Sequence, residues 1–214
     1  NGDDLLVGGA GDDSLDGGTG IDTADYSAAT APVTVNLASG SASGSMGSDT
    51  LIDLENIIGG TSADVLTGNP NANTLIGGGG DDRLNGGGGK DILTGLTGKD
   101  MFIFQTTRDS LLQAYDKISD LEIGVDVIDG PKAIAAAMLT KFGSVSALTE
   151  PGIQSTLTSD NFKADGAGIF TLGTGPSQQT FLAINDSIAG FNALSDAVVE
   201  ITGYRGNLQL LAIL

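Results

Sequence analysis

The sequence of 214 residues contains no cysteine, no histidine and no tryptophan. The first two absences exclude zinc sites of the usual ligands, Ser-His-Asp triads, cysteine nucleophiles and disulfides. Basic residues are also scarce, since 9 Lys and Arg face 27 Asp and Glu and the net charge is −18. Nucleic acid and anionic membranes repel such a chain, so neither is an expected partner. No apolar run approaches the ~20 residues of a transmembrane helix, and no signal peptide pattern is found.

Glycine and acidic residues, in contrast, are abundant and recur with a period of nine. Glycine occupies the first position of each unit, at Gly59, Gly68, Gly77, Gly86 and Gly95. An acid or amide occupies position six, at Asp64, Asn73, Asp82, Asp91 and Asp100. A large apolar residue occupies position eight, at Leu66, Leu75, Leu84, Leu93 and Phe102. This nonapeptide is typical of calcium-binding parallel β-helix repeats. A disordered glycine-rich linker is the alternative, but linkers lack a strict period.

Each residue type in the repeat has a physical role. Glycine suits positive φ and the crowding of carbonyls around an ion, and aspartate supplies the hard oxygen ligand that calcium prefers. One or two buried aliphatics per unit do not balance the backbone entropy that is lost when the whole unit is ordered. Stacked carboxylates also repel unless a divalent cation lies between them. We therefore expect folding and calcium binding to be one event.

These motifs resemble the repeats-in-toxin (RTX) family. The resemblance implies a mainly β fold: a right-handed parallel β-roll, or β-solenoid, in which two nonapeptides make one coil. It also implies that one turn gives carbonyls at positions two and four and the position-six carboxylate to each calcium. The turn two repeats later, one coil further along the roll, gives carbonyls at positions one and three and its own position-six carboxylate.

Carried onto this chain, that scheme predicts three sites in the second block of repeats, residues 59–104. They are Gly60, Ser62 and Asp64 with Gly77, Gly79 and Asp82; Gly78, Gly80 and Asp82 with Gly95, Thr97 and Asp100; and Asn69, Asn71 and Asn73 with Gly86, Gly88 and Asp91. The last is expected to be the weakest or empty, because Asn73 is neutral and Pro70 interrupts its turn. A further site would place Glu55 opposite Asn73.

An earlier block of repeats spans residues 1–25, and the chain opens in mid-repeat, so we expect residues to precede it. Gly2 and Asp4 would share a calcium with Gly17, Thr19 and Asp22. Gly9, Gly11 and Asp13 have no partner two repeats later, so their site needs an irregular one. In total we expect about four to six calcium ions.

Two segments interrupt or end the repeats. Residues 26–58 break the period with a strand-like run at Ala31–Leu37, a Gly/Ser loop at 39–48 and a return to the coil at 49–58. RTX proteins often carry such a hairpin, so we predict one extruded from the roll. Residues 105–130 would cap the roll. There Asp116 or Asp120 reaches the last calcium, or both are surface acids.

Residues 131–214 predict a small α+β C-terminal domain. The stretch 131–143 reads as a helix with Pro131 in its first turn and Ile134, Met138 and Phe142 on one face. A second short helix is expected around 154–157. Strand-like runs follow at 168–172, 180–184, 197–202 and 208–213, and suggest an antiparallel sheet. The ending resembles the "bluetail" domain of bacterial surface RTX proteins. The final LQLLAIL suits either a type I secretion signal or an ordinary last strand.

The leading functional hypothesis is a non-enzymatic calcium-binding module of a secreted or cell-surface protein, exported by type I secretion and folding outside the cell. Its role would be structural, surface-layer or adhesive, with self-association or surface polysaccharide as partners. The alternative is the stabilising and secretion module of an extracellular enzyme whose catalytic domain lies upstream, of the protease, lipase or alginate epimerase type. Catalysis within these residues is not expected, because protease and lipase chemistry of the usual kind needs histidine.

Overall fold

The computed structural model describes residues 1–134 and 139–214. The chain is mainly β and divides into two compact units, Asn1–Ile103 and Phe104–Leu214. None of the helices in the described residues has the length and apolar character needed to cross a bilayer.

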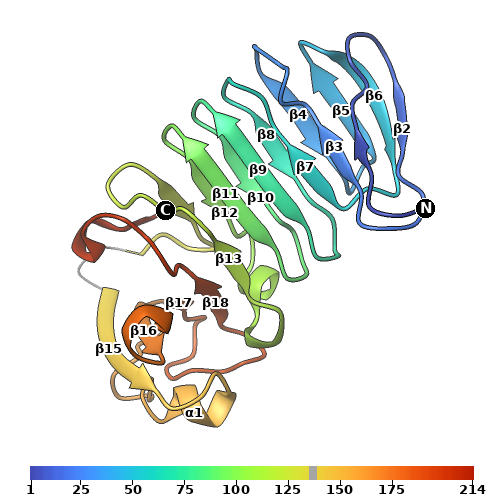
Figure 1. The fold of residues 1–214 in the computed structure, drawn as a ribbon. Helices are drawn as coiled ribbons and strands as arrows, with labels where there is room; N and C mark the ends of the chain where they lie inside the picture. The colour runs from blue at the N-terminus through green and yellow to red at the C-terminus, as the bar shows by residue number, and fades with distance from the viewer. Residues whose placement is uncertain (135–138) are drawn as a thin grey trace. The chain divides into compact units, whose positions relative to one another are not determined.

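The first unit consists of short, mostly parallel strands in two sheets (Figure 1). In the first sheet the order is β1 (Leu5–Leu6), β3 (Thr23–Asp25), β7 (Asn56–Ile58), β9 (Thr74–Gly79) and β11 (Ile92–Thr97). In the second sheet it is β2 (Ser14–Asp16), β6 (Gly47–Ile52), β5 (Ser41–Gly44), β4 (Val33–Asn36), β8 (Val65–Thr67), β10 (Arg83–Asn85) and β12 (Met101–Ile103). In the second block, consecutive nonapeptides therefore alternate between the two sheets.

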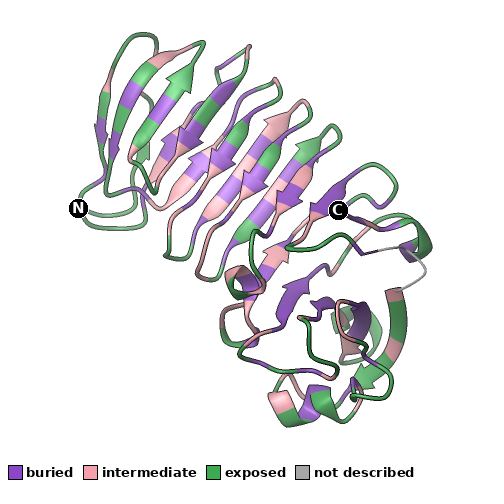
Figure 2. Cartoon of the chain, turned by 180° about the vertical axis from the view of Figure 1, so that it is seen from behind, coloured by how far each residue is buried: buried purple, intermediate pink, exposed green. Residues whose placement is uncertain are grey.

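The pairing follows the two-repeat period that the sequence implies. Leu66 of β8 pairs with Leu84 of β10, and Leu75 of β9 with Leu93 of β11, in parallel register. The position-eight side chains point inward and are buried, as the alternating colours along each strand in Figure 2 show. They are Leu15, Ala24, Ile57, Leu66, Leu75, Leu84, Leu93 and Phe102. These side chains form the core of the unit, because the short strands alternate between inward and outward positions.

The insertion at residues 26–58 differs from the prediction. Instead of projecting outward, β4, β5 and β6 form an antiparallel meander within the second sheet. β4 pairs in parallel with β8, and β6 in parallel with β2, so the insertion fills the gap between the two blocks of repeats. The physical reason is that Val33, Val35 and Leu51 are buried like the position-eight residues.

The second unit has a five-stranded and a two-stranded arrangement. The five strands run in the order β13 (Asp116–Ile118), β18 (Ala197–Glu200), β17 (Gln179–Ile184), β16 (Ala167–Leu172) and β15 (Leu139–Val145). β14 (Val127–Asp129) pairs with β19 (Ala212–Ile213). The antiparallel pairs β16–β17 and β17–β18 agree with three of the predicted strand-like runs. The fourth run is a short 3₁₀ turn at Leu208–Leu210 followed by β19.

The α+β prediction for this unit is wrong for the helix at 131–143, whereas the short helix expected around 154–157 has a counterpart a few residues earlier. The described residues hold a single α-helix, α1 (Glu150–Gln154), and short 3₁₀ turns that include Thr107–Ser110, Leu112–Ala114 and Gly175–Ser177. The predicted helix at 131–143 is not formed where it is described: Ile134 bridges to Ile213, and Phe142 lies in β15. Met138 lies outside the described residues. Pairing of β15 with β16 overrides the local helical pattern.

A cluster of aromatic and aliphatic side chains forms the core of the second unit. Phe170 stacks on Phe181 with ring centroids 5.3 Å apart, and Tyr115 meets Phe181 edge-on at 5.5 Å. Ile153 of α1 is fully buried against this cluster. Thr149 caps the helix, since its side chain accepts a hydrogen bond from the Gly152 amide. The aromatic cluster and the capped helix therefore hold the second unit together by ordinary apolar packing.

Candidate calcium sites

Most residues at position six of the repeats are buried although they are polar, whereas Asp4 is exposed and Asp13 is half-buried. Asp22 and Asp91 are 0% exposed, Asp64 and Asp82 are 1% exposed, and Asp100 is 2% exposed. Acidic side chains are almost never buried this completely unless they are paired or bind a metal. Each lies directly before a strand, so the parallel pairing of the strands places the acids of successive coils next to one another.

Hydrogen bonds connect these acids into two ladders. Oδ1 of Asp82 accepts the amide of Asp64 at 2.7 Å, and the amide of Asp82 in turn donates to Oδ1 of Asp100 at 2.9 Å, each across 18 residues. On the other edge Asp22 accepts the amide of Asp4 at 2.7 Å, and Asp91 accepts the amide of Asn73 at 2.8 Å. One oxygen of each of these carboxylates is thereby used within the protein.

For several of these acids the second oxygen is buried without a partner. Within the described part of the chain, Oδ2 of Asp13, Asp22 and Asp82 has no hydrogen-bond donor and almost no exposed surface. Burial raises the pKa of Asp82 to about 7, with the neighbouring acids Asp100, Asp64 and Asp81 adding to the shift. Burial also raises the pKa of Asp64, although the amides of Val33 and Gly60 lower it in part. A cation at these oxygens would remove the cost of burying the charge.

The position-one glycines form a cradle around the same oxygen. A Cβ on Gly77, Gly86 or Gly95 would collide with the position-six carboxylate of its own repeat. The φ angles of these glycines are not positive, so the close approach explains why glycine is needed there. Glycines at positions two and four, such as Gly78 and Gly80 at φ 105°, take the left-handed conformation instead.

The structure brings together the turns that were predicted to share an ion. The amide of Gly79 donates to the Gly60 carbonyl at 3.0 Å, that of Gly80 to Thr97 at 2.9 Å, and that of Gly2 to Thr19 at 2.9 Å. These carbonyls were predicted ligands, and each keeps a second lone pair. The Gly17 turn packs against Asp22, and Ser62 Oγ donates to the Thr30 carbonyl at 3.0 Å. Gly88 is half-buried, and a Cβ on it would have no neighbour within 4 Å. Ligation by these residues stays a prediction.

Carboxylates alone do not complete a site. Among the described residues no group of three or more His, Cys, Asp and Glu side chains is close enough to hold a metal ion. Two carboxylates and several carbonyls are nevertheless a suitable oxygen donor set for calcium, which takes six to eight such ligands. The buried partnerless oxygens, the glycine cradle and the adjacent carbonyls therefore fit a calcium ion.

Comparison with known families agrees with this geometry. The family model described as Peptidase M10 serralysin C terminal matches residues 13–204, and that of the RTX calcium-binding nonapeptide repeat (4 copies) matches residues 1–24. The chain belongs to the serralysin C-terminal family. No curated protein matches the sequence. The RTX resemblance is thus confirmed, whereas the likeness of the last residues to the "bluetail" domain stays a prediction.

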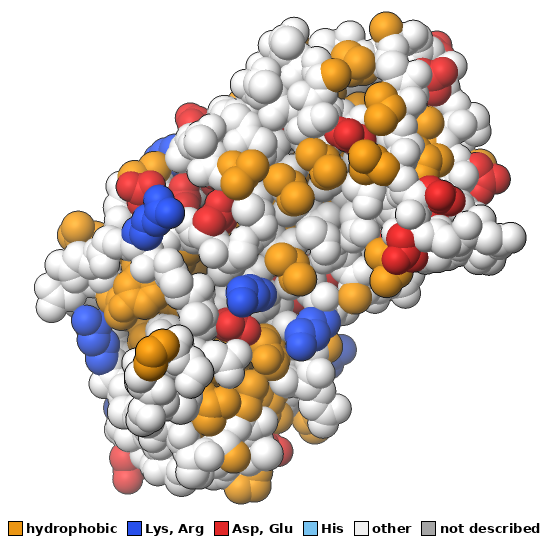
Figure 3. Space-filling view, in the orientation of Figure 1, with side chains coloured by type: hydrophobic (Ala, Val, Ile, Leu, Met, Phe, Trp, Pro, Cys, Tyr) orange, Lys and Arg blue, Asp and Glu red, His pale blue; other side chains and the backbone are white. Residues whose placement is uncertain are grey.

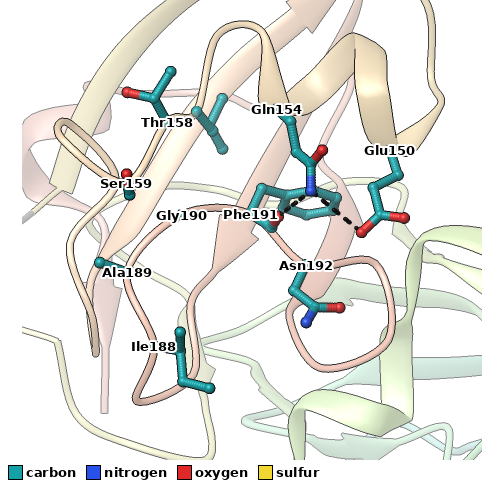
Figure 4. Close-up of a pocket in the computed structure, with 10 residues that line it drawn as sticks. Glu150, Gln154, Thr158, Ser159, Ile188, Ala189, Gly190, Phe191 and Asn192 are labelled. Atoms are coloured by element: carbon teal, nitrogen blue, oxygen red, sulfur yellow. Dashed lines mark hydrogen bonds between the residues drawn. The ribbon is translucent and has the colours of Figure 1, made fainter.

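Membership in the serralysin C-terminal family, together with the RTX repeats, makes this chain a calcium-binding module of a type I secreted, extracellular protein. Neither matched family is a catalytic module. The second unit contains a hollow of about 420 Å³ lined by α1 and the loop 188–192 (Figure 4). Its polar groups bind each other: Gln154 Nε2 donates to the Phe191 carbonyl at 2.9 Å and to Glu150 Oε1 at 3.4 Å.

The Asn73 position of this serralysin C-terminal module differs from its neighbours. The Asn73 side-chain oxygen accepts the Asn69 amide at 2.7 Å, and its nitrogen donates to the Glu55 carbonyl at 2.6 Å. Asn71 lies in the same turn and is exposed, with its amide bound to the Asn69 side chain at 2.9 Å. The amide group of Asn73 is thus satisfied without a metal, which supports the expectation of a weak or empty site.

Sequence reasoning missed the partner of Asp13 and left the role of Glu55 open. Asp49 accepts the amide of Asp13 at 3.0 Å across 36 residues, and Glu55 accepts the amide of Asp22 at 2.8 Å across 33. The signal was present for Asp49, since Asp49-Thr50-Leu51 repeats the spacing of positions six to eight. Asp120, predicted as a ligand of the last calcium, lies in the second unit after β13, and its role stays a prediction.

Proposed function

We propose that residues 1–103 form a right-handed parallel β-roll whose turns bind several calcium ions, about four to six, and that binding and folding are one event. The observation that carries this proposal is the burial of the position-six acids, with Oδ2 of Asp22 and Asp82 left without a donor. In the described residues neither acid forms an ion pair. A buried charge without compensation costs several kcal/mol, on the order of a domain's whole stability. The unit therefore needs cations in order to fold.

This requirement suits a protein that is exported before it folds. In a calcium-poor cytosol the acids of the repeats repel one another and the chain stays extended. Outside the cell, the calcium concentration reaches the dissociation constants of extracellular calcium-binding modules, ~10⁻⁴–10⁻³ M. Binding of calcium then orders the repeats into the coils of the roll. The folded roll serves a structural, surface-layer or adhesive role in the secreted protein.

Self-association is part of this proposal because the roll presents apolar side chains to solvent. Figure 3 shows such side chains across one face of the first unit, interspersed with acids. Exposed apolar side chains occur on both sheets: Ile52 and Val65 lie on strands of the second sheet, and Ile92 and Leu96 on β11 of the first. Surface polysaccharide is the weaker partner proposal, because Phe191 at the hollow of the second unit is buried and offers no face for a sugar ring. Sedimentation at several concentrations in calcium and a glycan array distinguish the two.

A second candidate is the stabilising and secretion module of an extracellular enzyme with its catalytic domain upstream. The name of the matched family, which refers to the serralysin peptidases, favours a protease. In that case the secreted parent protein hydrolyses casein, and its stability in calcium depends on this module. A parent protein without any turnover of protein, lipid or alginate would leave the structural role as the better explanation.

The proposal is tested by far-UV circular dichroism during a calcium titration, with magnesium as control and chelator for reversal. We expect a cooperative and reversible gain of β signal at roughly millimolar calcium, and none with magnesium. Full β signal in excess chelator would overturn the coupling of folding to export. The roll would then be a permanently folded spacer.

A further inference from the structure

The tip of the β5–β6 hairpin contacts the turn before β2 in the way that regular repeats contact one another. The amide of Gly11, at position four, donates to the carbonyl of Met46 at 2.7 Å. In the regular repeats the position-four amide donates to the position-three carbonyl of the next turn, as in Gly2 to Thr19 and Gly80 to Thr97, both at 2.9 Å. By this bond Met46 occupies position three of a repeat.

The hydrogen bonds at Ser48 and Asp49 also match those of the regular repeats. The amide of Ser48 donates to Oδ1 of Asp12 at 2.8 Å, and the amide of Asp13 to Oδ1 of Asp49 at 3.0 Å. In the regular repeats, the matching bonds at position five run from the amide of Ile21 to Oδ1 of Asp3 and from the amide of Lys99 to Oδ1 of Asp81. At position six they run from the amide of Asp4 to Oδ1 of Asp22 and from the amide of Asp82 to Oδ1 of Asp100. Ser48 and Asp49 thus stand at positions five and six.

Gly47 provides an independent check of this register. Its φ is 127°, and a Cβ on it would collide with the carbonyl of Gly11. Gly20 and Gly98, both at position four, have φ of 148° and 140°, and a Cβ on each would collide with the position-four carbonyl of the turn before it. The same conformation and the same obstacle place Gly47 at position four.

We propose that residues 46–52 follow positions three to nine of a further nonapeptide and that they complete a calcium site with the turn from Gly8 to Asp13. In this register Leu51, which is buried and pairs with Leu15, stands at position eight. Gly44, two residues before Met46, departs from the repeat, since its φ is 143° and it ends β5. Figure 1 shows β2 and β6 side by side. The two turns are 36 residues apart instead of 18, because the β4–β5 pair is inserted between them.

The site would take its ligands from both turns. By the scheme of the other sites these are the carbonyls of Gly9 and Gly11 with Asp13, and the carbonyl of Met46 with Asp49. Oδ2 of Asp13 is buried and has no hydrogen-bond donor in the described residues. That oxygen is available to a cation. The inference rests on the proposed function, since it adds one site to a calcium-binding roll.

Tyr26 distinguishes this site from the others. Its hydroxyl donates to Oδ2 of Asp49 at 2.8 Å, and its side chain is 4% exposed. The hydroxyl therefore orients one carboxylate of the site, which makes Tyr26 a positioning residue. Because the chain has no tryptophan, and the other tyrosines, Tyr115 and Tyr204, lie in the second unit, Tyr26 is also a local optical probe.

The first test is the number of bound calcium ions in the full chain, measured by equilibrium dialysis. We expect Asp13→Asn and Asp49→Asn each to lose one ion, or to bind it at least about tenfold more weakly, because asparagine keeps the shape and removes the charge. Asp16→Asn is the matched control, since Asp16 is exposed on the adjoining strand β2. Unchanged ion number and affinity in both turn variants would overturn the inference. A wild-type chain that binds no calcium would overturn the proposed function instead.

The second test uses terbium(III), whose luminescence is excited through a nearby tyrosine. We expect strong luminescence on exciting tyrosine in the wild type, loss of most of it in both Tyr26→Phe and Asp49→Asn, and full signal in Asp16→Asn. Circular dichroism of each variant in calcium separates loss of the site from loss of folding. If luminescence persists in a folded Asp49→Asn variant, the ion excited through Tyr26 lies elsewhere and the inference is wrong.

Discussion

The amide of Asp64 donates a 2.7 Å hydrogen bond to Oδ1 of Asp82, which lies 18 residues further along the chain. The amide of Asp82 repeats the arrangement with Asp100 at 2.9 Å. Asp82 is therefore the middle rung of its ladder, bound on both sides, and its second oxygen has no donor in the described structure. Under the proposed function it contributes to two calcium sites at once.

Replacement of Asp82 by asparagine should consequently weaken two sites. We expect Asp82→Asn to raise the calcium concentration at the folding midpoint by roughly tenfold or more, because ligand charge sets calcium affinity. Asp81→Asn is the control: it removes the neighbouring charge, and asparagine can still accept the Lys99 amide that Asp81 accepts at 2.9 Å. Circular dichroism against calcium concentration measures both. Equal midpoints for the two variants would contradict a ligand role for Asp82.

Two glycines of the roll should respond in opposite ways to alanine. In Gly77→Ala the new methyl group would collide with the Asp82 carboxylate, so we expect a loss of about 1–3 kcal/mol in calcium. In Gly88→Ala nothing lies within 4 Å and φ is not positive, so we expect a gain of about 0.4–1 kcal/mol. Thermal unfolding in saturating calcium compares them. Equal destabilisation of both variants would show that the close approach at position one is not what requires glycine.

Asn73→Asp should turn a metal-independent turn into a calcium-dependent one. The substitution removes the donor that now binds the Glu55 carbonyl at 2.6 Å, so without an ion at this turn we expect a loss of about 1–3 kcal/mol in the free energy of unfolding. In calcium the added charge should allow one more ion to bind. Asn71→Asp adds the same charge at an exposed position nearby and serves as control. Equal ion numbers in the two variants would argue against a site at this turn.

Asp196 in the second unit should show a titration well above the ordinary range of aspartate. Burial raises its pKa to about 6 and the Asp186 charge adds to the shift, while amides of Asp186 and Asn192 lower it in part. The folded state then holds a proton that the unfolded state has lost between about pH 4 and 6. This group's contribution to stability is fully present below about pH 4, falls as the pH rises to about 6, and is constant above.

Carbon NMR of the Asp196 carboxyl in the calcium-loaded chain measures this pKa directly. Asp186→Asn should lower the midpoint, because it removes the neighbouring charge and keeps an acceptor for the Ile188 amide, now bound at 2.7 Å. A wild-type midpoint near 4 would show that the site is better solvated than its burial indicates.

The repeat strands were predictable because their pattern is local and regular. Leu66, Leu75 and Leu84 recur at position eight, and burying each of them requires the same strand in every unit. The helix predicted at 131–143 failed for the opposite reason. Its apolar spacing and flanking Pro131 and Gly143 favour a helix locally, but Leu139 pairs with Ala167 in β15 and β16, a contact that local propensity does not specify.

The sequence by itself determined the chemistry of this protein: a period of nine with glycine, acid and leucine indicates calcium, and the absence of histidine and cysteine excludes the usual zinc and triad chemistry. Only the tertiary structure decided which turns face each other where the period breaks. Asp13 meets Asp49 across 36 residues and Asp22 meets Glu55 across 33. Spacing predicts neighbours only within an unbroken repeat. Across an insertion, the neighbouring turns are set by the pairing of β2 with β6 and of β3 with β7.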